Sequence, residues 1–234
     1  MARGRLFYLP GQIWHITHRC HNRCFLLKFA RDRKRWLFWL FQARKKYGLE
    51  ILNYIVTSNH IHLLVFDGTR QDAIPNSIRL IAGCTAREFN QRKSRSGAFW
   101  EDNYHATAVE SGIHLIQCML YIDLNMVRAG VVKIPEEWAF SGCNEIFSDR
   151  QRYRLINKEK LMEFLNFQNM EELRTNYRIW IANTITSDRL KQEKFWTECV
   201  AVGSKDYVDE IKSKLGIRAR HREIVRNQNS FLLR

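Results

Sequence analysis

The chain has 234 residues, of which 45% are hydrophobic, a share that excludes general disorder and allows one domain with an appendage or two small domains. Its formal net charge of +14 favours a polyanionic partner, nucleic acid first and an acidic membrane surface second. There is no apolar run of about 18 residues, and residues 1–6 lack the apolar part of a signal peptide. We therefore expect a cytoplasmic protein with no membrane partner.

Hydrophobic periodicity predicts the elements of the first part of the chain in order. An alternating strand covers 13–19, and a helix over 31–47 ends at Gly48. Strands over 49–57 and 60–66 form a hairpin around Ser58-Asn59. The remaining predicted elements are a helix over 73–92, a strand within 99–109, and a helix from Ser111 to about Val127 that stops at Gly130.

This order of elements predicts an α+β fold of the ferredoxin-like type, a sandwich of an antiparallel sheet with helices on one face. Beyond Pro135 the chain becomes charged and helical in pattern, with helices expected over 158–167, 171–184 and 205–215. We place a domain boundary near residue 150. Residues 151–234 then form a C-terminal helical appendage for DNA binding or oligomerisation.

Two histidines stand one residue apart in the strand predicted over 60–66. Strand side chains alternate between faces, so His60 and His62 project from the same side, with Cα atoms roughly 7 Å apart. Two imidazoles at that spacing can converge on one cation. Alone, the pair is equally compatible with structural histidines that are hydrogen-bonded in a core. Polar rings among apolar neighbours are costly unless something engages them.

The helix predicted from Ser111 carries a polar stripe formed by Gln117, Tyr121 and Asn125. Residues four apart on a helix are neighbours at about 6 Å. On an isolated helix such a stripe is ordinary. Together with the histidines, the amide oxygen of Asn125 makes a three-ligand site with open positions, suited to Mg²⁺ or Mn²⁺ bridging to phosphate oxygens. The phenol of Tyr121 beside it could attack phosphorus.

These residues resemble a known family. His60-Ile61-His62 matches the HUH motif, a hydrophobic residue between two histidines. Segment 121–130 resembles the tyrosine helix of single-tyrosine HUH transposases, in particular of the REP-associated tyrosine transposase (IS200-like) branch, which commonly reads Tyr-Ile-X-X-Asn-Pro-Val-Arg-Ala-Gly. Met126 stands where that branch usually has proline. Further agreement over about residues 5–145 comes from Tyr8-Leu9-Pro10-Gly11, His15-Ile16-Thr17-His18-Arg19, Phe99-Trp100, Pro135, Trp138 and Ser141.

The resemblance implies a metal-dependent transposase, with a catalytic domain over residues 1–150, that nicks single-stranded DNA and transfers the strand at hairpin or palindromic repeat ends. His60, His62 and Asn125 would bind a divalent metal, Mg²⁺ or Mn²⁺. Tyr121 would be the nucleophile, forming a 5′-phosphotyrosine link and freeing a 3′-hydroxyl. Relatives act as monomers or as homodimers, and the sequence leaves this open.

Basic residues are the other candidates for DNA contact. Arg92, Lys93 and Arg95 precede the strand that leads to the tyrosine helix and are suited to holding phosphates. Arg128 could hold a phosphate or act as a cation at a helix C-terminus. The alternative function is a non-catalytic single-stranded nucleic-acid-binding protein with an RNA-recognition-like fold. Its binding would be salt-sensitive and indifferent to metal.

Overall fold

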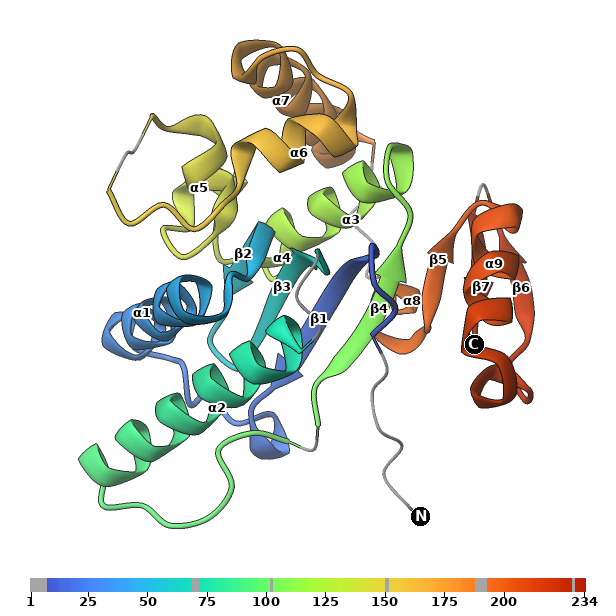
Figure 1. The fold of residues 1–234 in the computed structure, drawn as a ribbon. Helices are drawn as coiled ribbons and strands as arrows, with labels where there is room; N and C mark the ends of the chain where they lie inside the picture. The colour runs from blue at the N-terminus through green and yellow to red at the C-terminus, as the bar shows by residue number, and fades with distance from the viewer. Residues whose placement is uncertain (1–7, 69–71, 102, 150–151, 188–192, 229) are drawn as a thin grey trace.

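A computed structural model describes residues 8–68, 72–101, 103–149, 152–187, 193–228 and 230–234. Within these residues the strands form one seven-stranded sheet in the order β2-β3-β1-β4-β5-β7-β6 (Figure 1). Neighbouring strands are antiparallel except for β4 and β5, which are parallel. The expected α+β fold with a mainly antiparallel sheet is therefore confirmed.

The four strands predicted from the sequence form the first half of the sheet. Their bounds are β1 (Ile13–Arg19), β2 (Glu50–Val56), β3 (His60–Phe66) and β4 (His105–Val109). β1 lies between β3 and β4, and its register pairs Thr17 with His62 and Arg19 with His60. Strands flank β1 on both edges and helices cover both faces of the sheet, so nearly every side chain of β1 is buried.

Two long helices cover one face of this sheet. They are α1 (Ala30–Tyr47) and α2 (Ala73–Arg92), and they pack against each other. α1 buries Trp36, Leu40 and Ala43 at helical spacing, and it ends at Gly48, whose φ of 70° suits a residue without a side chain. On the sheet, His18 stacks on Trp100, whose indole N–H donates to the carbonyl of Ala82 in α2.

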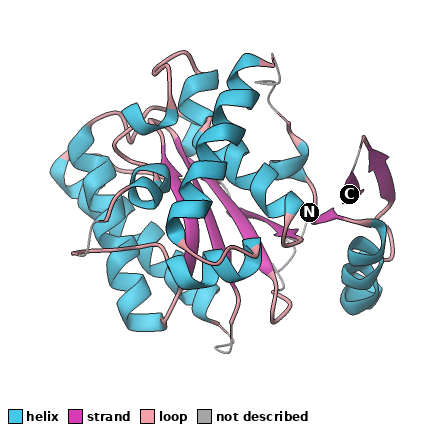
Figure 2. Cartoon of the chain, turned by 90° about the horizontal axis from the view of Figure 1, so that it is seen from above, coloured by secondary structure: helices cyan, strands magenta, loops and turns pink. Residues whose placement is uncertain are grey.

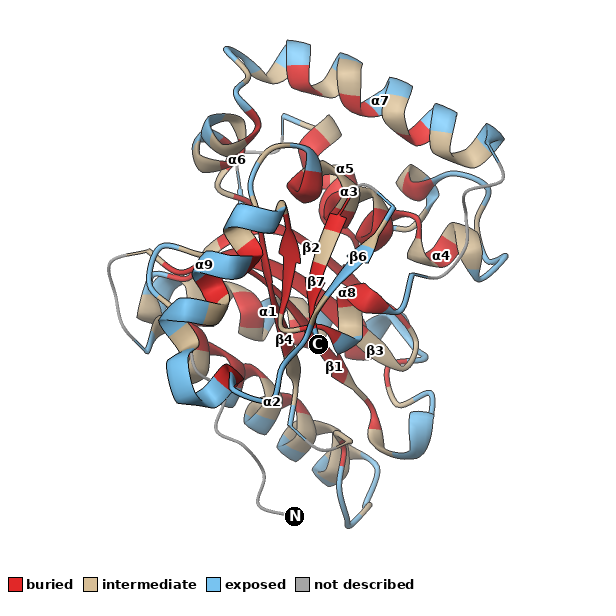
Figure 3. Cartoon of the chain, turned by 90° about the vertical axis from the view of Figure 1, so that its right-hand side faces the viewer, coloured by how far each residue is buried: buried red, intermediate tan, exposed pale blue. Residues whose placement is uncertain are grey.

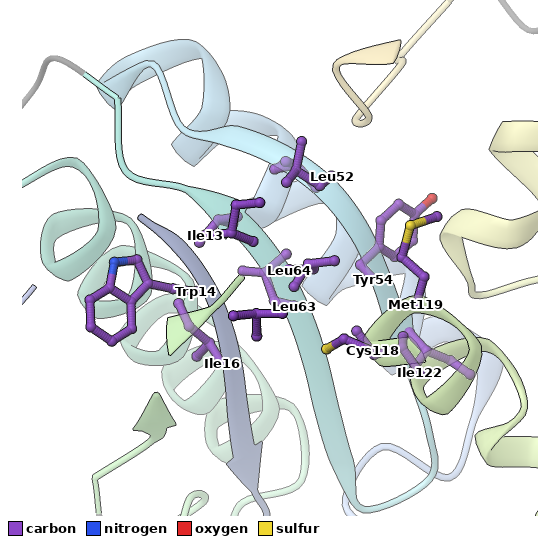
Figure 4. Close-up of a cluster of buried hydrophobic side chains, with 14 of the residues drawn as sticks. Ile13, Trp14, Ile16, Leu52, Tyr54, Leu63, Leu64, Cys118, Met119 and Ile122 are labelled. Carbon is purple, nitrogen blue, oxygen red and sulfur yellow. The ribbon is translucent and has the colours of Figure 1, made fainter. Parts of the chain in front are cut away.

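The sequence predicts helices on one face of the sheet only. The structure has a second set of helices on the opposite face. The set includes α3 (Ile113–Asp123), α6 (Lys158–Leu165) and α8 (Phe195–Glu198). Figure 2 shows helices on both sides of the strands. Figure 4 shows Cys118 and Ile122 of α3 beside the strand that carries Leu64. α3 contacts β2 and β4, and its last turn carries Tyr121, whose ring packs against His62 of β3.

The α3 helix ends earlier than predicted. Leu124, with φ −79° and ψ 4°, separates it from the short α4 (Asn125–Arg128), and Gly130 with φ 67° ends the segment. α5 (Gly142–Phe147) then packs against β2. Short 3-10 helices span His21–Arg23, Pro135–Glu137 and Gly216–Ala219. The break at Leu124 occurs with methionine, not proline, at position 126.

The C-terminal region is not only helical. Besides α7 (Met170–Thr186) and α9 (Lys205–Leu215), it supplies β5 (Ala201–Gly203), β6 (Ile224–Asn227) and β7 (Ser230–Leu233). These strands extend the sheet beyond β4, and β5 pairs with Ala108 and Val109. In Figure 3 the buried strands lie inside, while α7 and α9 turn exposed residues outwards. A domain boundary near residue 150 stays a prediction.

In the part of the chain that the structure describes, no helix is both long enough and apolar enough to cross a membrane.

Candidate active site

The predicted histidine pair lies on the face of β3 that α3 covers. His60 begins the strand and is partly buried, while His62 is 1% exposed. Their rings are close, with centroids 5.0 Å apart. The expectation that both side chains project from one side of a strand is therefore met.

Hydrogen bonds to the β2–β3 turn orient the ring of His60. Its Nδ1 lies 2.7 Å from Asn59 Oδ1 and 3.0 Å from Thr57 Oγ1. Thr57 donates its own hydroxyl proton to the carbonyl of His60, so its oxygen is an acceptor towards the ring. Nδ1 of His60 is thus the protonated nitrogen, and Nε2 keeps its lone pair.

The ring of His62 is held by β1. Its Nδ1 lies 2.9 Å from His15 Nε2 and 3.3 Å from Thr17 Oγ1. The other nitrogen of His15, Nδ1, lies 2.8 Å from the backbone carbonyl of Trp196 in α8. Both His15 and Trp196 are fully buried. A chain of polar contacts therefore runs from the C-terminal region through β1 to the histidine pair.

Asn125, the first residue of α4, closes the site. Its Nδ2 lies 3.4 Å from Nε2 of His60 and 3.2 Å from Nε2 of His62. The three predicted metal ligands therefore converge on one point. The described residues hold no cluster of three or more His, Cys, Asp or Glu side chains that could bind a metal.

Burial keeps the imidazoles neutral. It lowers the pKa of His15 to about 3 and that of His60 to about 4, where the charges of Arg19 and Arg128 act in the same direction. The pKa of His62 is lowered well below its ordinary value, again mainly by burial. Neutral imidazoles are the form that binds metal ions.

Tyr121 lies one helical turn before Asn125 and packs on the same histidines. Its ring centroid is 5.5 Å from that of His62 and 6.0 Å from that of His15, both edge to face. The guanidinium of Arg128 lies 4.6 Å from the centre of the phenol ring and donates to the backbone carbonyl of Tyr121, next to the helix break. Tyr121 is 5% exposed. The candidate nucleophile, the candidate ligands and the guanidinium of Arg128 thus lie in one site.

The segment that carries these residues matches a known family. The family model of IS200-like transposases matches residues 10–125, a segment that contains His60, His62, Tyr121 and Asn125. The chain belongs to the IS200-like transposase family. Transposases process DNA, so membership of this family makes the protein a DNA-processing enzyme. Among curated proteins no relative matches the chain.

One solved structure supports the fold over part of the chain. This transposase resembles a structure of the REP-associated tyrosine transposase bound to a REP hairpin, with a TM-score of 0.52 and 20% identity over 62% of this chain and 84% of that chain. A transposase candidate from Deinococcus radiodurans R1 matches with a TM-score of 0.34 and 21% identity over 45% of this chain and 84% of that chain.

Three of the four basic residues predicted to contact DNA lie away from the site, and their side chains have partners of their own. Arg92, at the end of α2, forms an ion pair with Asp32 of α1. Arg95 donates to Asn90 Oδ1 at 2.9 Å and to the carbonyl of Ala98 at 2.7 Å. Lys93 places its ammonium 5.6 Å from the centre of the Phe29 ring. Of the four predicted contacts, Arg128 is the one at the site.

Sequence reasoning missed several residues that complete the site. His15, Thr17 and Arg19 alternate along β1 and share a face, which the sequence does show. What it does not show is the pairing of that face with His60 and His62. Trp196 carries no signal at all, because its contribution is a backbone carbonyl.

Proposed function

We propose that this transposase is a metal-dependent enzyme that nicks and rejoins single-stranded DNA at hairpin-bearing ends, through a covalent link between Tyr121 and a DNA 5′ phosphate. The observation that carries the proposal is the convergence of His60 Nε2 and His62 Nε2 on the carboxamide of Asn125, with the ring of Tyr121 against His62.

The donor set fits a divalent cation of the Mg²⁺ or Mn²⁺ type. Both Nε2 atoms face the amide of Asn125, and that amide offers an oxygen as well as its nitrogen. Two neutral imidazoles and one carbonyl oxygen suit Mn²⁺ and leave coordination positions for phosphate oxygens. Bound there, the cation would polarise the scissile phosphate and stabilise the departing oxygen.

Tyr121 supplies the nucleophile. Its phenolic oxygen forms a bond to phosphorus while the bond from phosphorus to the 3′ oxygen breaks, the phenol losing its proton and the departing 3′ oxygen gaining one. The phosphodiester energy is kept in the tyrosine link, so a 3′-hydroxyl can later reverse the step without ATP. Restricted exposure of Tyr121 limits competing attack by water.

Two arginines supply positive charge around the reacting phosphate. Arg128 lies over the phenol ring, and Arg19 stands opposite His60 in the sheet register. Both charges lower the pKa of His60, which supports the view that their fields reach the ligand position. We assign them to stabilising the negative charge of the phosphate during attack.

Hairpin DNA is the substrate class that best fits the remaining observations. The net charge of +14 favours a polyanion, and the structural neighbour with the same fold is bound to a REP hairpin. We carry this substrate class over to the present chain as part of the proposal.

The test is formation of a covalent adduct. Labelled single-stranded hairpin oligonucleotides are incubated with the protein and Mn²⁺, and adducts are separated on a denaturing gel. We expect an adduct for the wild type, none for Tyr121→Phe, and an undiminished adduct for the control Tyr153→Phe, which changes an exposed tyrosine. DNA binding without any adduct, unaffected by a chelator or by His62→Ala, would overturn the proposal in favour of a non-catalytic binder.

A further inference from the structure

His15 connects the candidate ligand His62 to a part of the chain that lies outside the family match. Its Nε2 lies 2.9 Å from His62 Nδ1, and its Nδ1 lies 2.8 Å from the carbonyl oxygen of Trp196. The ring is 0% exposed. It is therefore a buried connector between two hydrogen-bonding partners.

The carbonyl at one end decides where each proton lies. A carbonyl oxygen only accepts, so at 2.8 Å the Nδ1 of His15 must carry a proton. A neutral imidazole has one N–H and one lone pair, so Nε2 of His15 is an acceptor towards His62. His62 must then donate from Nδ1, and its lone pair lies on Nε2, the atom that faces Asn125.

Neighbouring contacts agree with this assignment. Thr17 Oγ1, at 3.3 Å, is a second, weaker acceptor for Nδ1–H of His62. Around His15 stand the rings of His62 and Tyr121 and the carbonyl of Trp196, and a buried cation among them would be costly. The neutral form of His15 is thus the one that its surroundings support.

The carbonyl of Trp196 is itself held in place. The single hydroxyl proton of Thr107 in β4 is shared between this oxygen, at 3.2 Å, and the carbonyl of Cys199, at 2.7 Å, and His105 contacts the same Cys199 oxygen at 2.9 Å. The indole N–H of Trp196 donates to Glu193 at 3.0 Å. The segment over 196–199 is therefore fixed to the sheet by side chains of β4.

We propose that His15 is a positioning residue which, with the backbone carbonyl of Trp196, fixes His62 in the tautomer whose Nε2 lone pair faces the metal position. The C-terminal region thereby completes the site. Without the hydrogen bonds of His15, the proton of His62 could lie on Nε2, where it would prevent Nε2 from binding a cation. The consequence for metal binding rests on the proposed function, whereas the tautomer itself does not.

The tautomer can be observed directly in the metal-free wild type. Long-range ¹H–¹⁵N correlation spectra of histidine-labelled protein at neutral pH distinguish a proton on Nδ1 from one on Nε2. We expect His62 and His15 both to carry it on Nδ1. A proton on Nε2 of His62 in the folded wild type would overturn the inference without any variant.

Variants of His15 test the consequence. His15→Leu removes the acceptor and should give His62 a mixture of tautomers and about 10- to 100-fold weaker Mn²⁺ binding. In His15→Gln the amide can donate to Trp196 and accept from His62, so we expect partial recovery of both readouts. His18→Leu, on the other face of β1, is the matched control and should leave His62 and Mn²⁺ affinity unchanged.

The two proposals fail in different ways. If the wild type binds no Mn²⁺ but His62 shifts its tautomer in His15→Leu, the metal proposal fails and the positioning role of His15 is supported. If the wild type binds Mn²⁺ and folded His15→Leu binds it within twofold with an unchanged tautomer, the role of His15 is refuted. Thermal melting and circular dichroism establish that each variant is folded.

Discussion

Tyr177 of α7 donates a hydrogen bond of 2.6 Å to the carboxyl group of Asp123, the last residue of α3. The other carboxyl oxygen of Asp123 accepts from the side chain of Asn53 in β2 at 3.1 Å. Tyr177 and Asn53 are fully buried, and Asp123 nearly so. A helix of the C-terminal region is thus tied to the segment that carries Tyr121, in addition to the contact through His15.

Removing the hydroxyl of Tyr177 should destabilise the fold. Tyr177→Phe leaves one oxygen of a buried carboxyl without its donor, which typically costs about 1–3 kcal/mol. Urea unfolding measures the free energy of unfolding. The matched control is Tyr153→Phe, since that residue is 67% exposed, and it should fall within about 0.5 kcal/mol of the wild type. Equal stability of the two variants would contradict the role of the Tyr177–Asp123 bond.

Asp123 should also make stability depend on pH. Burial raises the pKa of Asp123 from 3.8 to about 7, against the hydrogen bonds from Tyr177 and Asn53, which lower it. Between about pH 4 and 7 the folded state holds a proton that the unfolded state has lost, so this group's contribution falls as pH rises, by up to about 1.4 kcal/mol per pH unit. Above pH 7 both states are ionised and the loss is complete.

The buried histidines act in the opposite direction, because the lowered pKa values of His15 and His60 make stability rise with pH. The difference between Asp123→Asn and the wild type isolates the carboxyl. We expect the Asp123→Asn variant to gain stability relative to the wild type from pH 4 to 7 and to level off above, measured by urea unfolding at each pH. A difference that is flat across this range would refute the raised pKa.

Long elements could be predicted from the sequence because their periodicity is a local property. β3 and α2 begin and end where the pattern places them, and Gly48 ends α1. β5, β6 and β7 were missed, since strands of three or four residues have too few positions to show alternation. Their existence depends on partners in the sheet, and β5 forms because β4 offers it an edge.

The residues of the candidate site also fall into those that the sequence could predict and those that it could not. His60, His62, Tyr121 and Asn125 carry spacing signals, and the structure brings them together. The second helix layer was missed because element order does not state which face α3 covers. The position of His15 beside His62 depends on the β1–β3 register, which no local pattern reveals.

The basic residues near the end of α2 are expected to differ in their contribution to DNA binding. Arg92 is paired with Asp32 and Arg95 with loop carbonyls, whereas Lys93 lies over Phe29 with its ammonium able to meet a phosphate. Lys93→Ala should weaken binding of single-stranded DNA and lower the slope of log affinity against log salt by about 1. Fluorescence anisotropy at several salt concentrations measures this slope, and an unchanged slope would remove Lys93 from the interface.

Gly142 allows a test of the packing around Asn53, the partner of Asp123, and Gly83 provides the control. A Cβ at Gly142 would overlap Asn53 Oδ1 and lie 2.9 Å from Ile156 Cδ1, whereas one at Gly83 in α2 meets nothing within 4 Å. Gly142→Ala should therefore destabilise by about 1–3 kcal/mol. Gly83→Ala should stabilise by about 0.5–1 kcal/mol, through the higher helix propensity of alanine. Urea unfolding of both variants decides, and a neutral Gly142→Ala would show that Asn53 is free to move.

Asn125 gives the sharpest test of the third ligand. With its amide between two Nε2 lone pairs, it acts in the metal-free protein as a hydrogen-bond donor. Asn125→Asp keeps the shape but replaces the donor with a negative oxygen ligand, so metal-free stability should fall while Mn²⁺ affinity rises by about tenfold, or 1.4 kcal/mol. Asn125→Ala should lose affinity by a similar factor. Calorimetric Mn²⁺ titration, with melting curves with and without Mn²⁺, separates these effects. If the aspartate variant binds Mn²⁺ no better than the alanine variant, residue 125 is only a structural donor to the two imidazoles.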